Sequence, residues 1–459
     1  MARSYAVSCA VLTLLLSPVA AGATELLGRA VLPAATFATG PASGQFITSA
    51  NGEPVPFAGQ PVQGFSAVLP GPAASTYYAL VDNGYGAQGN SADALLRFYA
   101  VRPDFTTGTV APVNAVTGAA LPSFNASSFV QLRDPNRVAG FPIVADRSTY
   151  PGSAIAVDAS IGAGRLLTGA DFDIESFRRV PDGTFYIGDE FGPFLLHTDA
   201  SGVLLERAIP LPNALGLGPN PLVQSPSYPA TTSGGLPPLT TANLPNSKGF
   251  EGMALNASGT RLYAFLEGPL TTDPQRDRLL INEFDLATRS YTGRVFPYRM
   301  DDPGNAIGDL TAISDTEFLV IERDNGEGAA ARFKRIFRIS TAEIGADGFV
   351  SKTLVADLLN ISDPNGLGGN GTAGGVFTFP FTTIESVLPV NDRTLLVLND
   401  NNYPFSSGRT PGRADNDEFI LIRLDQPLAV PEPGSLALLG TAIAGLTSLR
   451  RRAAQRRKE

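Results

Sequence analysis

Residues 167–197 read LTGADFDIESFRRVPDGTFYIGDEFGPFLLH, and the fold prediction starts from this stretch. Two short apolar runs, 171–175 and 184–187, lie on either side of a Pro181-Asp-Gly turn. Short aromatic and aliphatic runs bounded by Gly, Asp and Pro are typical of strands joined by tight turns. The stretch therefore predicts an antiparallel hairpin, with Glu175 near the start of its first strand and Glu190 after the end of its second.

The same hairpin recurs along the chain. Its second strands are predicted at 76–81, 184–187, 261–266, 317–321 and 394–398. First strands precede them at 63–66, 171–175, 248–252, 306–310 and 383–386, and third strands follow at 95–99, 279–284, 335–339 and 419–424. A unit of three or four strands that recurs every 50 to 80 residues or so (about one propeller blade) predicts a β-propeller.

We therefore predict an all-β protein, a β-propeller of five to seven blades with six favoured, and irregular inserted loops. Five units are clear, and a sixth is expected within residues 110–167. The Pro-rich segment 210–245 is predicted to be an inserted loop. A β-sandwich also uses many short strands, but it does not require an acid at the same place in every unit.

Carboxylates recur at two fixed places in the predicted hairpins. The leading and trailing acids are 15 or 16 residues apart in four units: Glu175 and Glu190, Glu251 and Glu267, Asp309 and Asp324, Glu385 and Asp400. In the first unit Ser66 takes the leading place and Asp82 the trailing one. Because these two places lie side by side in a hairpin, the acids of a propeller would converge on one mouth of its central channel.

A ring of carboxylates repels itself unless a cation lies among them, and sites made only of oxygen atoms suit Ca²⁺. The chain has one His, His197, and one Cys, Cys9, which leaves little for zinc or copper. We therefore predict Ca²⁺ as the cofactor, and we expect His197, in the middle of a strand, to be structural. The predicted metal ligands are Glu175, Glu190, Glu251, Glu267, Asp309, Glu322 and Glu385.

Two alternatives stay open for these acids. Glu322 competes with Asp324, because a register slip of one residue turns a side chain to the other face of its strand. Asp, Asn and Gly at strand ends are also common turn formers, which is the simpler interpretation of any single acid. The repetition across four units favours a metal site for the set.

Basic residues accompany the acids. Lys248 stands three residues before Glu251, and Arg323 lies within the block IERDNG at 321–326. A mouth with both Ca²⁺ and basic side chains suits an anionic substrate such as a phosphate ester. Arg332 and Arg335 follow, and neutralisation of neighbouring carboxylates is an equal alternative for them. The predicted catalytic residues are Glu251, Glu175, Lys248 and Arg323, the last two as the clamp on the phosphate.

Both ends of the chain carry export signals. Residues 1–23 combine Arg3, an apolar stretch and small residues up to Ala23, the pattern of a cleavable signal peptide. The last segment, 430–459, has a Val430-Pro-Glu-Pro motif, sixteen uncharged residues at 434–449 and three arginines at 450–452. This length is short of the ~20 residues usual for a spanning helix, so a sorting segment and a thin membrane anchor both remain open. Residues 24–429 are the expected propeller domain.

Charge excludes one class of partner. The chain has 34 Lys and Arg against 43 Asp and Glu, a formal net charge of −9. A nucleic-acid-binding protein would need a basic stripe, so we expect no nucleic-acid partner.

Two resemblances extend these predictions. The block at 167–197, with KGFEGMA at 248–254, IERDNG at 321–326 and TIES at 383–386, resembles the esterase-like/phytase-like family of secreted bacterial proteins over about residues 60–425. This resemblance implies a β-propeller with a phosphoesterase-type activity, by kinship with calcium-dependent propeller phytases. The C-terminal segment resembles the PEP-CTERM sorting signal of Gram-negative bacteria, which implies cleavage near the motif by an exosortase-type enzyme.

The sequence thus predicts an exported calcium-dependent phosphoester hydrolase that acts on a small anionic ester at a carboxylate-lined propeller mouth. Its expected location is the periplasm or the cell surface of a Gram-negative bacterium, with membrane contact through 434–449 before processing. One alternative is a propeller lactonase or carboxylesterase, which also uses channel Ca²⁺ to polarise an ester carbonyl. Another is a non-catalytic, calcium-stabilised binding protein of the envelope or matrix.

Overall fold

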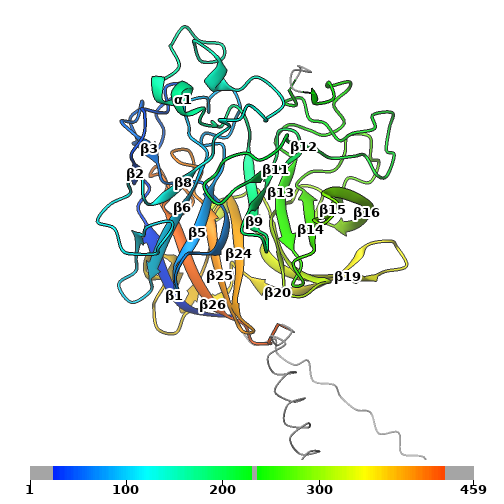
Figure 1. Cartoon of the computed structure of the whole chain (residues 1–459). Coiled ribbons are helices and arrows are strands. Elements are labelled where there is room, and N and C mark those ends of the chain that lie inside the picture. Colours follow the sequence, from blue (N-terminus) through cyan, green and yellow to red (C-terminus); the bar gives the residue numbers. More distant parts are fainter. Residues whose placement is uncertain (1–23, 230–234, 429–459) are drawn as a thin grey trace, which may run out of the picture.

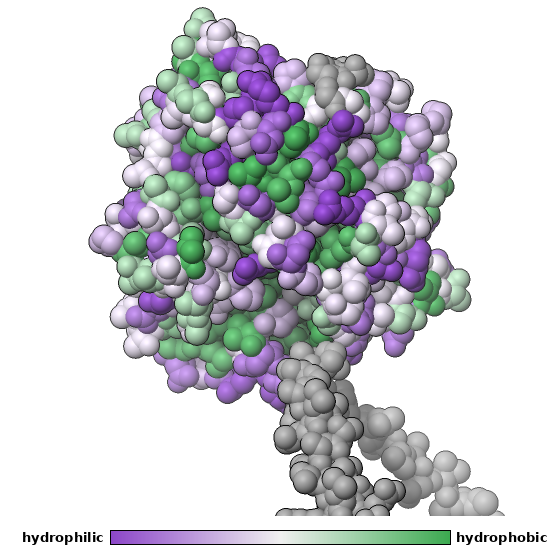
Figure 2. Space-filling view, in the orientation of Figure 1, coloured by the Kyte–Doolittle hydropathy of each residue, from purple (hydrophilic) through white to green (hydrophobic). Residues whose placement is uncertain are grey.

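The computed structural model describes residues 24–229 and 235–428 (Figure 1). The expected signal peptide at 1–23 and the expected sorting segment at 430–459, including its apolar stretch 434–449, lie outside the described residues. Within the described ranges, no helix is long and apolar enough to cross a membrane. The face shown in Figure 2 intersperses hydrophilic and hydrophobic residues.

Most strands fall into five antiparallel units of four strands, which we number 1 to 5 in chain order; units 1 and 5 are joined into one larger sheet by a parallel pairing of Val31 with Thr109. Unit 1 contains β4 (Phe65–Pro70), β5 (Tyr77–Val81), β6 (Arg97–Asp104) and β7 (Thr109–Pro112). Unit 2 contains β9 (Ile174–Arg179), β10 (Phe185–Asp189), β11 (Phe194–Thr198) and β12 (Ile209–Pro210). Unit 3 contains β13 (Phe250–Leu255), β14 (Arg261–Leu266), β15 (Arg278–Asp285) and β16 (Ser290–Arg299). Unit 4 contains β17 (Ala306–Ala312), β18 (Glu317–Arg323), β19 (Lys334–Ile344) and β20 (Val350–Asp357). Unit 5 contains β24 (Thr383–Asn391), β25 (Thr394–Asp400), β26 (Asp417–Arg423) and β1 (Glu25–Leu32).

The first strands of the five units form a closed ring. β4 contacts β9, β9 contacts β13, β13 contacts β17, β17 contacts β24, and β24 contacts β4. Sheets arranged radially around inner strands define a β-propeller, so the predicted fold is confirmed. The second strands predicted from the sequence are β5, β10, β14, β18 and β25.

The hydrophobic core is divided among the junctions between units. Five buried clusters each join two neighbouring units. Between units 1 and 2, for example, the rings of Phe98 and Phe185 have centroids 5.1 Å apart. Each inner hairpin is therefore apolar on both faces, which explains why the second strands are nearly continuous apolar runs.

Unit 5 is completed by the first strand of the described chain. β1 pairs antiparallel with β26, from Glu25 beside Arg423 to Leu32 beside Asp417. Its residues alternate between buried and more exposed positions, as a strand with one covered face does. The two ends of the domain are thus held in one unit, although residues 25 and 423 are far apart in sequence.

The prediction of a sixth unit is wrong. Residues 110–167 do not form a further four-stranded sheet. They contain the end of β7, the short strand β8 (Phe129–Gln131) paired with β6, the turn η1 (Val144–Asp146) and the helix α1 (Ala159–Gly164). Frequent Gly and Pro interrupt this segment, so most of it forms loops. In the segment 210–245, no strand follows β12 within the described residues, as predicted for an inserted loop.

The remaining short elements decorate these units. β2 (Phe37–Ala38) pairs with β3 (Gln60–Pro61), and β21 (Ile361–Ser362), β22 (Thr372–Ala373) and β23 (Val376–Phe377) pair beside β1. The turns η3 (Gly328–Ala330) and η4 (Gly369–Gly371) lie in loops of units 4 and 5.

Candidate functional site

Every inner hairpin has a β-bulge at the same place. The pairing of first and second strands shifts by one residue near the start of the first strand, in all five units. The residues left unpaired by these shifts are Ser66, Glu175, Glu251, Gly308 and Glu385. A bulge re-aims one side chain and is common beside active sites. Here it directs three glutamates toward the centre of the ring.

The second strand of each hairpin supplies a further residue at the same level. Each of these residues lies opposite the first-strand residue that stands two positions before the bulge. Glu190, for instance, donates its backbone N–H to the carbonyl of Asp173 at 2.8 Å. The five residues are Asp82, Glu190, Glu267, Arg323 and Asp400. All are buried despite their charge.

The resulting cluster, which we call the carboxylate ring, holds eight buried acids at one mouth of the channel. They are Asp82, Asp173, Glu175, Glu190, Glu251, Glu267, Glu385 and Asp400. Neighbouring units touch here, since a Cβ on Gly249 would lie 2.4 Å from the carbonyl oxygen of Glu190.

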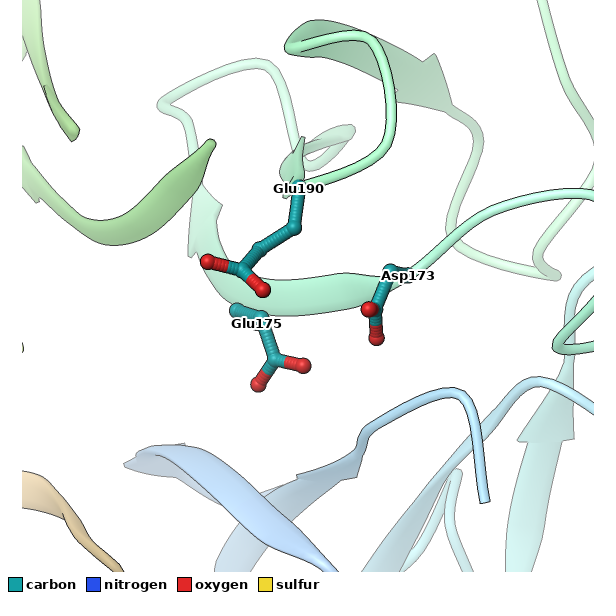
Figure 3. A group of neighbouring side chains, drawn as sticks. All are labelled: Asp173, Glu175 and Glu190. Atoms are coloured by element: carbon teal, nitrogen blue, oxygen red, sulfur yellow. The ribbon is translucent and has the colours of Figure 1, made fainter. Parts of the chain in front are cut away.

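Three of these acids converge in the view of Figure 3. Glu175 lies near the start of β9, Asp173 directly precedes this strand and Glu190 directly follows β10, and the three carboxylates point into one space. One oxygen from each lies within 4.8 Å of the others. Glu190, Glu251 and Glu267 form a second group of the same kind. Glu190 belongs to both groups.

Several oxygens in the ring have no hydrogen-bond partner although they are buried. They are Oδ1 of Asp173, Oε1 of Glu190 and Oε1 of Glu251. Buried polar atoms are nearly always paired, and exceptions call for an explanation such as a bound ion. An oxygen-only set of this size fits a hard cation that takes six to eight ligands, roughly the preference of Ca²⁺.

Two basic side chains border one side of the ring. Arg323 Nη2 lies 3.3 Å from Glu267 Oε1, 3.2 Å from Glu385 Oε1 and 4.0 Å from Glu251 Oε1. Lys248 Nζ forms a salt bridge with Glu267. Lys248 is the more accessible of the two, with 39% of its side chain exposed against 5% for Arg323.

Burial and mutual repulsion both favour the protonated forms of the ring acids. Burial, then the neighbouring Asp400, raise the pKa of Glu385 to about 8. Burial raises the pKa of Asp173 to about 6, and burial with the charges of Glu267 and Asp173 raises that of Glu190 well above its usual range. Burial opposes the charge of Lys248, but Glu267 and Glu190 outweigh it and raise the pKa of this ammonium. The ring therefore favours positive charge, as protons or as a cation.

Unit 4 departs from the sequence-based pairing by one residue. The spacing paired Asp309 with Asp324, whereas the structure places Gly308 at the bulge and Arg323 opposite Ala306. Asp324 instead lies 2.9 Å from Lys334 Nζ, outside the ring.

Asp309 lies next to the ring but is already paired. Arg178 reaches from unit 2 to unit 4, which are not neighbours, so its side chain crosses the channel. Its Nη2 lies 3.2 Å from Asp309 Oδ1 and donates at 2.7 Å to the carbonyl of Leu310. The backbone N–H of Val387 donates to Asp309 Oδ2 at 3.0 Å. Both Asp309 oxygens are thus occupied by protein donors.

Glu322 points away from the ring, to the other face of β18. It accepts hydrogen bonds from four groups: Tyr298 Oη at 2.5 Å, the Asp301 N–H at 2.8 Å, Asn305 Nδ2 at 2.8 Å and Lys352 Nζ at 2.5 Å. The expected ligands Glu175, Glu190, Glu251, Glu267 and Glu385 therefore come together, while Asp309 and Glu322 do not join them.

The sequence pattern did not predict Asp173 as a member of the ring. It stands two residues before Glu175, at a position that is Gly64, Gly249, Ala306 or Thr383 in the other units. No repeat therefore marked it. The signal that could have found it is the acid triplet of 171, 173 and 175, which places Asp173 and Glu175 on one face of an extended segment.

The other basic and imidazole side chains have partners elsewhere. His197 Nδ1 lies 2.7 Å from Glu206 Oε1, and Arg335 Nε lies 3.2 Å from Asp357 Oδ2. Arg332 Nη1 donates at 2.6 Å to the carbonyl of Ala329.

A pocket of about 320 Å³ lies beside the segment that leads into β9. It is lined by Gln88, Phe141, Pro142, Val144, Arg147, Pro151, Ala170, Asp171 and Pro229. Asp171, which lines this pocket, precedes the ring residue Asp173 by two positions, and its carboxylate accepts hydrogen bonds from the N–H groups of Val144 and Thr168, both at 2.8 Å.

A family model described as phytase-like, "esterase-like activity of phytase", matches residues 60–403. This range includes every residue of the carboxylate ring and covers most of the chain. The chain belongs to the phytase-like family.

Two further comparisons describe the relatives of this phytase-like protein. An uncharacterized secreted protein of Arthroderma benhamiae is 25% identical over 262 residues, which are 52% of this chain and 48% of that protein. The chain thus matches about half the length of this relative. Residues 429–452 match the PEP-CTERM protein-sorting motif, so the phytase-like protein is exported and its tail is of the kind that an exosortase-type enzyme recognises.

Solved structures resemble the phytase-like protein only distantly. The calcium-binding protein regucalcin of Agrobacterium tumefaciens aligns with 12% identity and a TM-score of 0.34, over 89% of this chain and 98% of its own. Aldose sugar dehydrogenase of Streptomyces coelicolor aligns with 11% identity and a TM-score of 0.31, over 86% of this chain and 98% of its own.

Proposed function

We propose that this phytase-like protein is a calcium-dependent phosphoester hydrolase whose site is the carboxylate ring. The observation that carries the proposal is the convergence of eight buried acids on one channel mouth, with unpartnered oxygens on Asp173, Glu190 and Glu251 and with the cations Lys248 and Arg323 on one side of the ring. Membership of a family described by an esterase-like activity of phytase supports hydrolysis of an ester.

The ring acids would divide two tasks. Asp173, Glu175 and Glu190 would hold Ca²⁺, because their oxygens already converge within 4.8 Å. When bound, the ion would supply neutralisation of a phosphate and a lower pKa for a water molecule. Glu251, with one unpartnered buried oxygen, would orient the attacking water. Asp309 and Glu322 have no part in this proposal, because protein donors already occupy their oxygens.

The basic residues would bind the anionic group. Lys248 is partly exposed at the mouth, so it can reach a ligand while it stays near Glu267. Arg323 lies deeper and presents a planar fork of donors, which matches the oxygens of a phosphate. The buried Arg178 crosses the channel, so we propose that substrate enters and leaves through the mouth.

The position of the ring within the fold suits an exported, tethered protein. Leu428, the last described residue, donates its N–H to Asp392 at the β24–β25 turn, whereas Asp400 lies at the opposite end of β25. The described chain therefore ends away from the mouth. We propose a periplasmic or surface location, with membrane contact through 434–449 before processing and the mouth facing away from the membrane.

The test is a substrate panel with the purified protein. p-Nitrophenyl phosphate, bis-p-nitrophenyl phosphate, phytate, a lactone and an acyl ester would each be assayed with Ca²⁺ and with EDTA. The proposal expects hydrolysis of at least one phosphate ester that stops in EDTA and returns with Ca²⁺. Calcium-dependent hydrolysis confined to lactone or acyl ester would replace it with a lactonase or carboxylesterase. Inertness toward all five, with Ca²⁺ raising only the melting temperature, would leave a calcium-stabilised binding protein.

A further inference from the structure

The fourth unit breaks the repeat of the carboxylate ring. At the place where the other units end their second strand with an acid, unit 4 has Arg323. At the bulge it has Gly308, and a Cβ there would lie 2.0 Å from the carbonyl oxygen of Ile384. Unit 4 therefore contributes one cation to the ring and no carboxylate.

The two acidic groups that share Glu190 consequently differ in charge. The group of Glu190, Glu251 and Glu267 lies against Arg323 and Lys248, which form salt bridges with Glu267, and Arg323 also lies 4.0 Å from Glu251. In the group of Asp173, Glu175 and Glu190, no Lys or Arg of residues 24–229 and 235–428 forms a salt bridge with any of the three.

Unpartnered oxygens point to a ligand in the group that forms no salt bridge with a basic residue. Asp173 and Glu190 are 3% and 5% exposed, and each has one oxygen without a partner within the described structure. In the other group, the nearest positive charge to the unpartnered Oε1 of Glu251 is Arg323. A divalent cation there would have to sit close to a guanidinium and an ammonium, and such like charges repel strongly when buried.

We propose that Arg323 and Lys248 take the place of a second metal ion, so that the ring binds one Ca²⁺, at Asp173, Glu175 and Glu190. The inference rests on the proposed function for the presence and position of Ca²⁺, and it adds the number of ions and the two basic residues that determine this number. Removal of the two cations would open the group of Glu190, Glu251 and Glu267 to a second ion.

The test is the calcium stoichiometry of the metal-stripped protein, measured by isothermal titration calorimetry and checked by elemental analysis after dialysis. Wild type is expected to bind one Ca²⁺ and Lys248→Gln/Arg323→Gln to bind two. Lys248→Gln alone is a second test in case the double variant does not fold, because Lys248 is partly exposed. This single variant is expected to gain a weak second Ca²⁺ site. Arg413→Gln, an exposed residue without a side-chain partner within the described structure, is the matched control and should bind one.

Each outcome is decisive. Two ions in wild type, or one ion in both folded variants, would overturn the inference and leave a calcium-dependent function intact. No bound Ca²⁺ in wild type would overturn the inference together with the proposed function.

Discussion

The Nη2 atom of Arg323 lies 3.2 Å from Oε1 of Glu385, although the two residues come from neighbouring units and are separated by 61 intervening positions. Both are buried. This pair joins unit 4, which brings a cation and no carboxylate to the ring, to one of the acids that surround that cation, so Arg323 sets the charge of the mouth as well as its shape.

Replacement of Arg323 should destabilise the metal-free protein. Arg323→Gln removes the charge that faces Glu267, Glu385 and Glu251, and the loss of one partner from a buried ion pair costs about 3 kcal/mol. Chemical denaturation in EDTA would measure the change in the free energy of unfolding. The exposed control Arg413→Gln should change it by less than about 0.5 kcal/mol. An equal effect of both substitutions would contradict the assigned role.

Glu190 faces the carboxylate ring, whereas Glu322 is a buried acid that points away from it. Glu190→Gln removes the acid shared by both groups and should weaken Ca²⁺ binding at least tenfold, while Glu322→Gln should leave it unchanged. Glu322→Gln should instead lower stability by about 3 kcal/mol, because it breaks the buried contact with Lys352. Calorimetric titration with Ca²⁺ and a denaturation curve would be run on both variants. Loss of Ca²⁺ binding in Glu322→Gln would refute the placement.

Gly308 should tolerate no side chain. A Cβ at this bulge would come within 2.0 Å of the Ile384 carbonyl oxygen, so Gly308→Ala forces the inner strands of units 4 and 5 apart, at a cost of about 3 kcal/mol or more. Gly89 is the matched control, since nothing lies within 4 Å of its added Cβ, and Gly89→Ala should be neutral. The melting temperatures of the two variants give the comparison, and equal values would disprove the close approach.

Asp309 should matter for stability and not for calcium. Asp309→Ala leaves the buried Arg178 without its carboxylate, and we expect a loss of about 3 kcal/mol with unchanged calcium stoichiometry. Denaturation and calcium titration of the same sample would test both parts. A variant of full stability that no longer binds Ca²⁺ would return Asp309 to the set of ligands.

Stability without metal should fall as the pH rises. The pKa of Glu385 is raised from 4.5 to about 8 in the folded protein, so the folded state holds a proton that the unfolded state loses above pH 4.5. This contribution is complete below pH 4.5 and is lost as the pH rises toward 8. The melting temperature in EDTA should therefore drop between pH 5 and pH 8, by roughly 5 °C, and Ca²⁺ should reduce the drop. A melting temperature in EDTA that rises over this range would contradict the assignment.

Much of this arrangement could be predicted because the repeat is local. Hairpins such as 171–175 with 184–187 are recognisable from their apolar runs and turn residues. Their acids recur at the same two positions of each hairpin. The bulge in unit 4 lies one residue earlier than the acid spacing suggested. The spacing predicts Asp309 and Asp324 at the two ring positions of this unit, and the structure has Gly308 and Arg323 there. Nothing in the composition of one strand marks such a slip, because both faces of β18 are buried.

Other features depend on contacts between distant segments. The sequence of β1 shows no sign that it pairs with β26, nearly four hundred residues away. The link from Arg178 to Asp309 joins units that are not neighbours in the ring, and Asp173 belongs to the ring only because Glu190 folds back beside it. The expected sixth unit does not form for the same reason, since β7 completes unit 1 and the residues that follow form only loops, the short strand β8, η1 and α1.

The central claim is that ester hydrolysis takes place at the carboxylate ring and needs calcium. The most direct measurement is the turnover of bis-p-nitrophenyl phosphate by wild type, Glu251→Gln and the buried control Glu322→Gln, each with Ca²⁺ and with EDTA. The account predicts turnover by wild type and by Glu322→Gln in Ca²⁺ only, and a loss of at least about a hundredfold in Glu251→Gln. Turnover that persists in EDTA, or that survives Glu251→Gln, would contradict it.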